Sequence, residues 1–424
     1  MIGVLFILLF VFLLSAMPVF IAMSSASVLS LSLFSPIPLE VVAQRMFSGI
    51  DKFSLMAVPF FILAANIMKG GGMSKRIINV ADKLVGHLSG GLAMATVISC
   101  MFFGALSGSS PATVIAIGGL LLPELLNANY GEKFSLGLIT ATPAVAVIIP
   151  PSIGMIIYGT VTGVSIGDLF IGGVGPGLVW GLITIAYCYF YAKKHKVPVK
   201  KRASFKELMT AIKDAGWALG VPIIIIGGIY GGIFTPTESS VVAAIYAIIV
   251  SLFIYKELSF KELMNETIDS AVGTAQIMVL LAAASIFSWI LTRQQVPQVL
   301  AAGLMGITNS KISILLMINI ILIIAGMFID AASIQTILSP LFLPVAINYG
   351  IDPVHLGIIM VVNGAIGMST PPFGLNLFVS SGVAKKPLGT IIKGTMPFIL
   401  LSLIAMAIVT YVPQVTMFLV NAMK

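Results

Sequence analysis

Residues 104–113 read Gly104-Ala-Leu-Ser107-Gly108-Ser109-Ser110-Pro111-Ala-Thr113, and residues 148–152 read Ile148-Ile149-Pro150-Pro151-Ser152. Both clusters of small, hydroxyl and proline residues interrupt long apolar runs. Proline removes a backbone donor and clashes with the preceding helical turn, so such clusters break helices and leave N–H and C=O groups without helical partners. Within a membrane, these breaks are tolerated only where they are buried in protein or line a cavity. The stretch from Gly104 to Pro151 therefore predicts half-helix ends that face an internal site.

A similar arrangement follows later in the chain. Residues 326–333 read Gly326-Met-Phe-Ile-Asp330-Ala-Ala-Ser333, and residues 367–372 read Gly367-Met-Ser369-Thr370-Pro371-Pro372. A shift of 221 residues (123 to 344) superposes Pro123 on Pro344, Pro150-Pro151 on Pro371-Pro372 and Pro176 on Pro397. This coincidence predicts two repeats, each with a re-entrant helical hairpin and a broken transmembrane helix, and a binding site between the repeats.

The composition is that of a membrane protein. Hydrophobic residues make up 58% of the 424 residues, charged residues only 9%, and the mean hydropathy is +1.11. A soluble domain is roughly a quarter charged. With about 20 residues per span, the chain has room for on the order of ten to fourteen membrane segments. We expect an all-α polytopic membrane protein.

The repeat predicts the organisation of the whole chain. We expect a first repeat over residues 1–192, a linker over 193–215 and a second repeat over 216–424, with hairpins at about 88–126 and 312–343 and broken helices at about 134–163 and 353–382. One closing span is expected over Lys393–Leu419.

The distribution of positive charge predicts opposite topologies for the two repeats. If the basic linker is cytoplasmic, all Lys and Arg residues except five of the 23 fall on the cytoplasmic side. The five exceptions are Arg45, Lys52, Arg293, Lys311 and Lys424. This agrees with the excess of positive charge in cytoplasmic loops of membrane proteins. The first hairpin then enters from the cytoplasm, the second enters from outside, and both termini are periplasmic.

The two hairpin tips and the two breaks supply the candidate site residues. The first tip and break contribute Ser107, Gly108, Ser109, Ser110, Thr113, Pro150, Pro151 and Ser152. The second tip and break contribute Asp330, Ala331, Ser333, Asn363, Gly364, Thr370 and Pro371. Hydroxyls and half-helix carbonyls are ligands for Na⁺, and half-helix N-termini favour an anion. Helix packing by small residues is the alternative, but two such clusters in corresponding positions, each paired with Pro-Pro, favour a site for Na⁺ and substrate. Na⁺ is the only metal expected.

Asp330 is the most informative single residue, because an ionisable group deep in an apolar segment is costly and points to function. It could bind Na⁺, exchange a proton, or cap the helix that begins at Ala331. Its counterpart in the first repeat is Ser109, so the two repeats differ chemically at this position.

Enzymatic chemistry finds no support in the sequence. His87, His195 and His355 are isolated from one another, and no Gly-rich phosphate loop followed by Lys-Ser/Thr is present. The basic linker is explained by a cytoplasmic loop, so we expect no nucleic acid partner. We therefore expect neither an enzyme nor a cofactor other than Na⁺ as a coupling ion.

Four stretches carry a resemblance to a known family. They are residues 57–64 (AVPFFILA), 85–93 (VGHLSGGLA), 103–113 (FGALSGSSPAT) and 149–153 (IPPSI). With them, nearly the whole chain resembles the large membrane subunit of tripartite ATP-independent periplasmic (TRAP) transporters, within the ion transporter superfamily. The resemblance implies an elevator-type carrier in the bacterial inner membrane that uses a Na⁺ gradient to import an organic acid, commonly a C4-dicarboxylate or sialic acid.

The same resemblance implies the partners. Substrate arrives on a soluble periplasmic binding protein, and a small four-helix membrane subunit completes the scaffold in the lipid bilayer. Because the two repeats account for nearly all of the chain, they leave no room for the four helices of this subunit, and we expect it to be a separate protein. The alternatives are a stand-alone carrier of related fold, coupled to protons or Na⁺ and working without a binding protein, and, less well supported, an ion channel.

Overall fold

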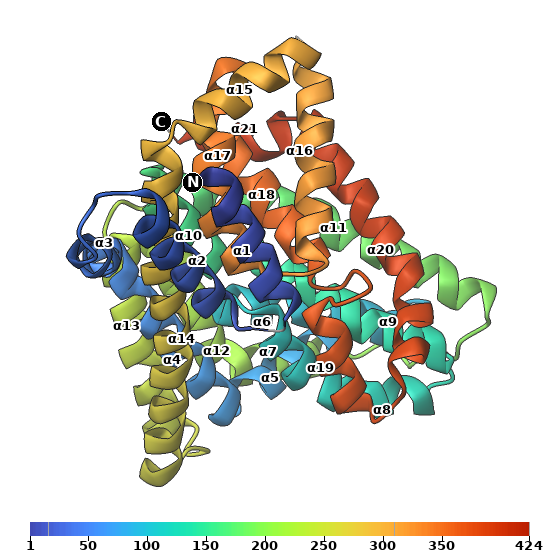
Figure 1. The fold of residues 1–424 in the computed structure, drawn as a ribbon. Coiled ribbons are helices and arrows are strands. Elements are labelled where there is room, and N and C mark those ends of the chain that lie inside the picture. Colours follow the sequence, from blue (N-terminus) through green and yellow to red (C-terminus); the bar gives the residue numbers. More distant parts are fainter. Residues whose placement is uncertain (16, 309, 424) are drawn as a thin grey trace.

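The computed structural model describes residues 1–15, 17–308 and 310–423, and of residues 105–107, 301, 304, 305 and 307 it describes the backbone alone. These residues form helices and connecting turns, with no β-strand in the described part (Figure 1). An all-α fold is therefore confirmed.

The helices of the first half are α1 (Ile2–Leu14), α2 (Val19–Phe34), α3 (Glu40–Ile50), η1 (Phe53–Met56), α4 (Ala57–Gly70), α5 (Met73–Val85), α6 (Gly91–Ser107), α7 (Ser110–Thr113), η2 (Val114–Gly118), α8 (Gly119–Asn127), α9 (Glu132–Ala141), η3 (Thr142–Val147), α10 (Ile153–Thr162) and α11 (Ile166–Lys194). Those of the second half are α12 (Phe205–Tyr230), α13 (Pro236–Ile249), η4 (Val250–Ile254), α14 (Phe260–Arg293), α15 (Val296–Ile307), α16 (Lys311–Gly326), α17 (Ala331–Asn348), α18 (Pro353–Gly367), α19 (Leu375–Ala384), α20 (Leu388–Tyr411) and α21 (Gln414–Ala422).

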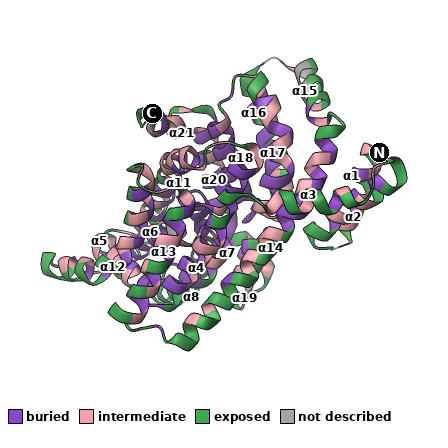
Figure 2. Cartoon of the chain, turned by 90° about the vertical axis from the view of Figure 1, so that its left-hand side faces the viewer, coloured by how far each residue is buried: buried purple, intermediate pink, exposed green. Residues whose placement is uncertain are grey.

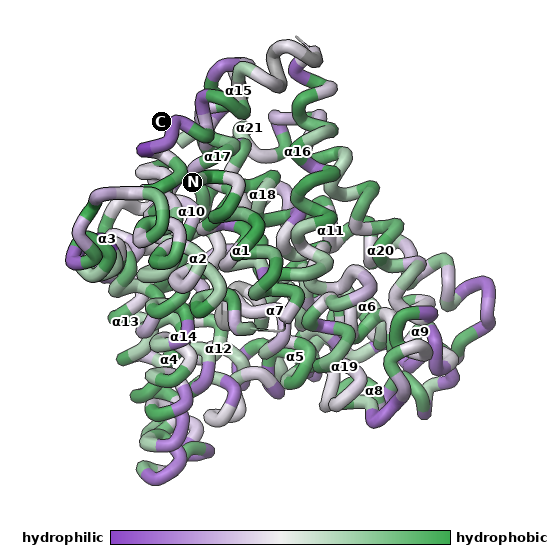
Figure 3. The backbone as a smooth tube through the Cα atoms, in the orientation of Figure 1, coloured by the Kyte–Doolittle hydropathy of each residue, from purple (hydrophilic) through white to green (hydrophobic). Residues whose placement is uncertain are grey.

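Eight helices in the described part are long and apolar enough to cross a membrane. Among them are the 34-residue α14 and the 29-residue α11. Hydrophobic residues cover most helices, and hydrophilic residues gather at helix ends and in connecting segments (Figure 3). The chain is a multi-pass membrane protein.

The helices form an inner group and an outer group. In the inner group, α18 packs against α16, α17 and α20, while α9 packs against α20 and α6 against η3. All residues of α18 from Val354 to Gly367 are buried, and Figure 2 draws the chain coloured by burial. In the outer group, α14 packs against α2, α3 and α4, and α13 packs against α4 and α12. The broken helices thus lie in the centre of the protein, where their open backbone is shielded from lipid.

Helix α5 connects the two groups, because it follows α4 and packs against both α12 and α6. Arg76 fixes it there. Its guanidinium lies 3.2 Å from Asp214 and 2.7 Å from Glu257, and it stacks 3.8 Å above the ring of Tyr255. Burial alone would lower the pKa of Arg76, but the hydrogen bonds to Glu257 and Asp214 raise it above its ordinary value. The cation is therefore permanent, and it holds one end of α5 against the outer group.

Several boundaries differ from those expected. The non-helical part of the expected 193–215 linker covers only residues 195–204. Helix α12 starts early because Ser204 and Glu207 form a capping box, in which each side chain bonds the other's backbone N–H. The expected closing span over Lys393–Leu419 is two helices, α20 and α21, because Pro413 ends the hydrogen-bond ladder between them. Helix α15 was not expected at all.

The first break is also wider than the Pro-Pro pair alone predicts. Helix α9 ends at Ala141, and the tighter turn η3 follows until Val147. Pro143 stands at the start of η3, where it cannot donate to the preceding α-helical turn. In the second half the matching helix α18 runs without interruption to Gly367. The two halves therefore differ in the length of their breaks.

Close packing of α20 on α9 depends on a glycine, which gives a test of the inner group. A Cβ at Gly394 would lie 3.2 Å from the backbone nitrogen of Gly137 and also meet the Lys133 carbonyl, whereas a Cβ at Gly389 on the same helix meets nothing within 4 Å. We expect Gly394→Ala to destabilise the protein by about 1–3 kcal/mol through overpacking. Gly389→Ala should be neutral or slightly stabilising because alanine favours helix. Thermal unfolding in detergent measures both, and equal midpoints for the two variants would contradict this packing.

Candidate functional site

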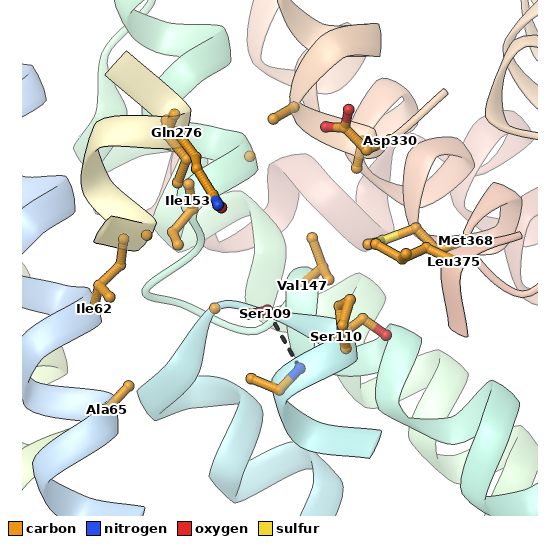
Figure 4. Close-up of a pocket in the computed structure, with 18 of the residues that line it drawn as sticks. Ile62, Ala65, Ser109, Ser110, Val147, Ile153, Gln276, Asp330, Met368 and Leu375 are labelled. Carbon is orange, nitrogen blue, oxygen red and sulfur yellow. Dashed lines mark hydrogen bonds between the residues drawn. The ribbon is translucent and has the colours of Figure 1, made fainter. Parts of the chain in front are cut away.

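A cavity of about 510 Å³ lies where the inner and outer groups meet. From the inner group it is lined by Phe103, Gly108, Ser109, Ser110, Pro111, Ala112, Val147, Ile153, Gly154, Asp330, Ala331, Ala332, Met368 and Leu375. From the outer group it is lined by Ile62, Ala65, Asn66 and Lys69 of α4 and by Asp269, Gly273, Gln276, Ile277 and Leu280 of α14. Both hairpin tips, which are 221 residues apart in sequence (109 to 330), therefore open onto one chamber (Figure 4).

The first tip is a tight reversal at Gly108. Helix α6 ends there because Gly108 adopts a left-handed conformation with φ +55°, which glycine tolerates without a steric penalty. Ser109 then caps α7, and its Oγ accepts a hydrogen bond from the Ala112 N–H at 3.5 Å (Figure 4). The Thr113 hydroxyl donates to the Ser109 carbonyl at 2.8 Å. The residues of this tip from Gly108 to Ala112 line the cavity.

The first helix break, at Pro150-Pro151, packs against this tip on the side away from the cavity. A Cβ at Gly108 would lie 3.2 Å from the Pro151 carbonyl oxygen, so the two segments are in close contact. Ser152 caps α10 by accepting a hydrogen bond from the Met155 N–H at 3.4 Å. Pro150, Pro151 and Ser152 do not line the cavity themselves; the next residues, Ile153 and Gly154, do.

The second tip is capped by a carboxylate. Asp330 accepts a hydrogen bond from the Ser333 N–H at 3.0 Å and another from the Ser333 hydroxyl at 2.5 Å, so it is the N-cap of α17. Its side chain is partly exposed and lines the cavity, as Figure 4 shows, together with the buried Ala331. Capping, one of the three roles considered for Asp330, is therefore present, and the carboxylate also faces the chamber.

The remaining predicted residues of the second break lie behind the tip. Asn363 is fully buried and donates to Asn319 Oδ1 at 2.7 Å and to the Ile359 carbonyl at 2.8 Å. A Cβ at Gly364 would lie 3.1 Å from Ala331 Cβ, so the broken helix α18 packs directly on the second tip. The Thr370 hydroxyl donates to the Ile366 carbonyl at 2.7 Å. These residues, Pro371 among them, do not line the cavity.

Ser107 cannot be placed, since its side chain lies outside the described part of the structure. Of the other predicted residues, five line the chamber: Gly108, Ser109, Ser110, Asp330 and Ala331. The other predicted residues do not line the cavity and lie next to these five, within the tips and breaks. Within the described residues, no three His, Cys, Asp or Glu side chains gather as a site for a transition metal.

Sequence reasoning missed the outer wall of the chamber. Asn66 and Lys69 are three residues apart on α4, and Asp269 and Gln276 are seven apart on α14, so each pair shares one helix face. The Asn66 amide donates to the Ser270 hydroxyl at 2.9 Å and fastens α4 to α14. The sequence did contain a signal for this wall, namely polar residues at helical spacing inside two apolar runs. Helical periodicity alone could not show that the face they share points toward the hairpin tips.

A profile of the family described as "Tripartite ATP-independent periplasmic transporter, DctM component" matches residues 6–415. The chain belongs to this family. It is 42% identical to the C4-dicarboxylate TRAP transporter large permease protein DctM of Pseudomonas aeruginosa, over 93% of this chain and 92% of that protein. It is 40% identical to the ectoine TRAP transporter large permease protein TeaC of Halomonas elongata, over 96% of each. The resemblance stated from the four motifs is confirmed.

Another relative of this DctM-family chain is longer. The isethionate TRAP transporter permease protein DctMQ of Oleidesulfovibrio alaskensis is 45% identical over 96% of this chain, and the chain spans 64% of that protein's length. Among solved structures, the YdaH transporter of Alcanivorax borkumensis matches with a TM-score of 0.63 and 14% identity over 90% of this chain and 89% of that one. This likeness shows the fold. The relatives are named as transporter permeases, which agrees with the absence of an enzyme signature.

The two roles of Asp330 can be separated by substitution. Asparagine caps helices about as well as aspartate, so we expect Asp330→Asn to keep the thermal midpoint, whereas Asp330→Ala should lose about 1 kcal/mol with the cap. If the charge also serves the site, uptake by Asp330→Asn in proteoliposomes should fall to background although the protein is folded. Uptake at the wild-type rate in Asp330→Asn would mean that capping is the whole role.

Proposed function

We propose that this chain is the large permease of a Na⁺-driven TRAP importer for a small organic acid, working by an elevator movement in the bacterial inner membrane. The observation that carries the proposal is the shared chamber of the two hairpin tips. Two long helical segments, Ser110–Asn127 and α17, begin there. Their positive dipole ends favour an anion, and their capping oxygens suit a cation.

The charges of the chamber support coupling of an anion to a cation. Its charged lining residues are Lys69, Asp269 and Asp330 within the described part, with only Lys69 positive. A substrate carboxylate at the tips would therefore meet Asp330 without a neighbouring arginine or lysine at the tips. Na⁺ bound at the tips would offset both negative charges. Coupling to Na⁺ would therefore explain why the Asp330 carboxylate faces a chamber that binds an organic anion.

The substrate class follows from the relatives. Their printed names include C4-dicarboxylate, ectoine and isethionate transporters. For this chain we propose a small organic acid of the C4-dicarboxylate or sialic acid type. A chamber of about 510 Å³ lies within the range of about 300–1,000 Å³ common for small-molecule sites.

The partners proposed are a soluble periplasmic binding protein and a small four-helix membrane subunit made as a separate chain. The family description as a tripartite transporter supports two partners. In the elevator movement, the inner group carries the tips past the wall formed by α4 and α14. With both termini periplasmic, as we propose, Lys69 and Asp269 would lie toward the cytoplasmic ends of α4 and α14.

Coupling and partner dependence can be tested together in proteoliposomes that contain this chain, its small subunit and the cognate binding protein. We expect uptake of a radiolabelled organic acid only with an inward Na⁺ gradient and with the binding protein present. Ser109→Ala combined with Ser110→Ala should reduce this uptake to background, since it removes two tip hydroxyls. Uptake driven by a pH gradient without any binding protein would favour the stand-alone carrier instead.

The elevator movement can be tested by cross-linking. Gln276 on the outer wall and Ile153 on the inner wall line the same chamber (Figure 4). With Cys100 and Cys188 replaced by alanine, a bismaleimide joining Gln276→Cys to Ile153→Cys should stop uptake, because the two walls must move apart. The control is the same double variant treated with a monofunctional maleimide, which modifies both cysteines without joining the two walls and should retain uptake. Full uptake with the pair cross-linked would contradict an elevator.

A further inference from the structure

Two arginines share one aromatic ring in the outer group. The guanidinium carbon of Arg45, on α3, lies 5.1 Å from the centroid of the Trp289 ring, and that of Arg293, at the end of α14, lies 5.4 Å from it. The two cations are therefore no farther apart than the sum of these distances. An arginine over an indole is a favourable cation–π contact, but the ring has no net charge. The Trp289 cluster, defined as Arg45, Trp289 and Arg293, thus carries two positive charges at close range.

Arg45 and Arg293 are two of the five basic residues that the charge distribution places on the non-cytoplasmic side. Lys52 and Lys311, also among the five, donate to backbone carbonyls at 2.8 and 2.9 Å. Within the described part of the chain, neither guanidinium of the cluster forms an ion pair or a side-chain hydrogen bond, and both residues are exposed. Both cations are therefore available to a ligand.

Arg76 provides an internal comparison. It also stacks on an aromatic ring, that of Tyr255, but its guanidinium is paired with Asp214 and Glu257. The Trp289 cluster has the ring and the cations without the carboxylates. An anion from outside the chain would complete the arrangement.

Packing fixes the position of Arg45 relative to Trp289. The Ser285 hydroxyl, one helical turn before Trp289 on α14, donates to the Arg45 carbonyl at 2.5 Å. A Cβ at Gly49 would collide with the Ser285 side chain, so α3 lies directly on α14 at this point. Trp289 itself is partly buried against apolar residues of α1, α2 and α14. The cluster is therefore held in place by two helices that are far apart in the sequence.

The cluster lies where α14 leaves the hydrocarbon of the membrane. Between Asp269 and Arg293, α14 contains no charged residue, and this length, about 36 Å at 1.5 Å per residue, slightly exceeds the ~30 Å hydrocarbon core. Arg293 therefore lies at the boundary, and Trp289 lies one turn before it, at the depth where tryptophan is enriched. On α3, Leu39 is 48% exposed and Phe47 is 72% exposed. Exposed apolar side chains on a short helix at this depth suit contact with acyl chains.

We propose that the Trp289 cluster binds the phosphate group of an anionic phospholipid, whose acyl chains lie along the exposed apolar residues of α3. Guanidinium groups bind phosphate oxygens through paired, charge-assisted hydrogen bonds. The apolar side chains beside the cations favour a phosphate attached to acyl chains over free phosphate in solution. Such a lipid would tie α3 to α14 and reinforce the outer group. The site goes beyond the import function proposed above, and its occupancy requires neither substrate nor Na⁺.

Lipid titration of the purified full-length chain in detergent tests the site, with native mass spectrometry to count bound lipids and the thermal midpoint as a second readout. The probe is dioleoylphosphatidylglycerol. Dioleoylphosphatidylcholine, which has the same acyl chains but no net charge, is the lipid control and should bind more weakly. In Arg45→Gln combined with Arg293→Gln, the half-saturating phosphatidylglycerol concentration should rise about tenfold or more, since each basic residue near a membrane surface contributes about fivefold to the binding of anionic lipid.

The matched control is Lys201→Gln combined with Arg202→Gln, which removes two positive charges from the linker between α11 and α12. Its half-saturating concentration should equal that of the wild type. Equal rises in the two double variants would mean that phosphatidylglycerol responds to net charge alone, and this result would overturn the site.

A purely structural role of the arginines gives another pattern. The midpoint without lipid would then fall in the Arg45→Gln, Arg293→Gln variant while its half-saturating lipid concentration stayed at the wild-type value, and the proposal would be wrong. Because both arginines are exposed, we expect this variant to fold. If it does not, either single glutamine variant should raise the half-saturating concentration about fivefold.

Two further titrations test the source of the anion. Inorganic phosphate that reproduces the midpoint rise in the wild type, but not in the arginine variant, would identify a soluble ligand and overturn the assignment to a lipid. Repeating the lipid titration with the small membrane subunit bound tests the other occupant of this face. Loss of the bound phosphatidylglycerol would then assign the cluster to the contact between subunits and contradict the proposal, whereas we expect the lipid to remain.

Discussion

Every backbone N–H and C=O group that leaves a helix within the membrane must find a partner in the protein, and this requirement organises the structure. The two helix breaks and the two hairpin tips carry most of these groups. They are grouped at the centre, where α18 is buried from Val354 to Gly367 and packs against α10, α11, α16, α17 and α20. A chamber with polar tips inside an apolar protein is the consequence of collecting these groups in one place.

Side chains at the tips complete the helix ends. Ser109 and Asp330 each accept a hydrogen bond from the backbone N–H three residues on, so the two tips share one capping geometry. They differ in charge, and that difference makes the chamber asymmetric. Both capping residues also line the cavity, so each can stabilise its helix and still face the chamber.

The outer wall gives the chamber its second side. Helices α4 and α14 are fastened to one another by Asn66 and Ser270, and α5 is fastened to α12 by Arg76. The inner group meets this wall across the chamber, and polar bonds also join the two sides elsewhere, among them those of Lys52 Nζ to the Thr160 carbonyl and of the Tyr230 hydroxyl to the Phe170 carbonyl.

The sequence by itself determined the all-α membrane fold and the positions of both tips and both breaks, because proline, glycine and N-capping residues act locally on the helix. It also pointed to Asp330, since a charge in an apolar run is costly wherever it lies. Only the tertiary structure decided that Asn66, Lys69, Asp269 and Gln276 face the tips and that Asn376 meets Ser110. These contacts join residues up to 266 positions apart. Helical periodicity shows which residues share a face, but packing alone decides what that face meets.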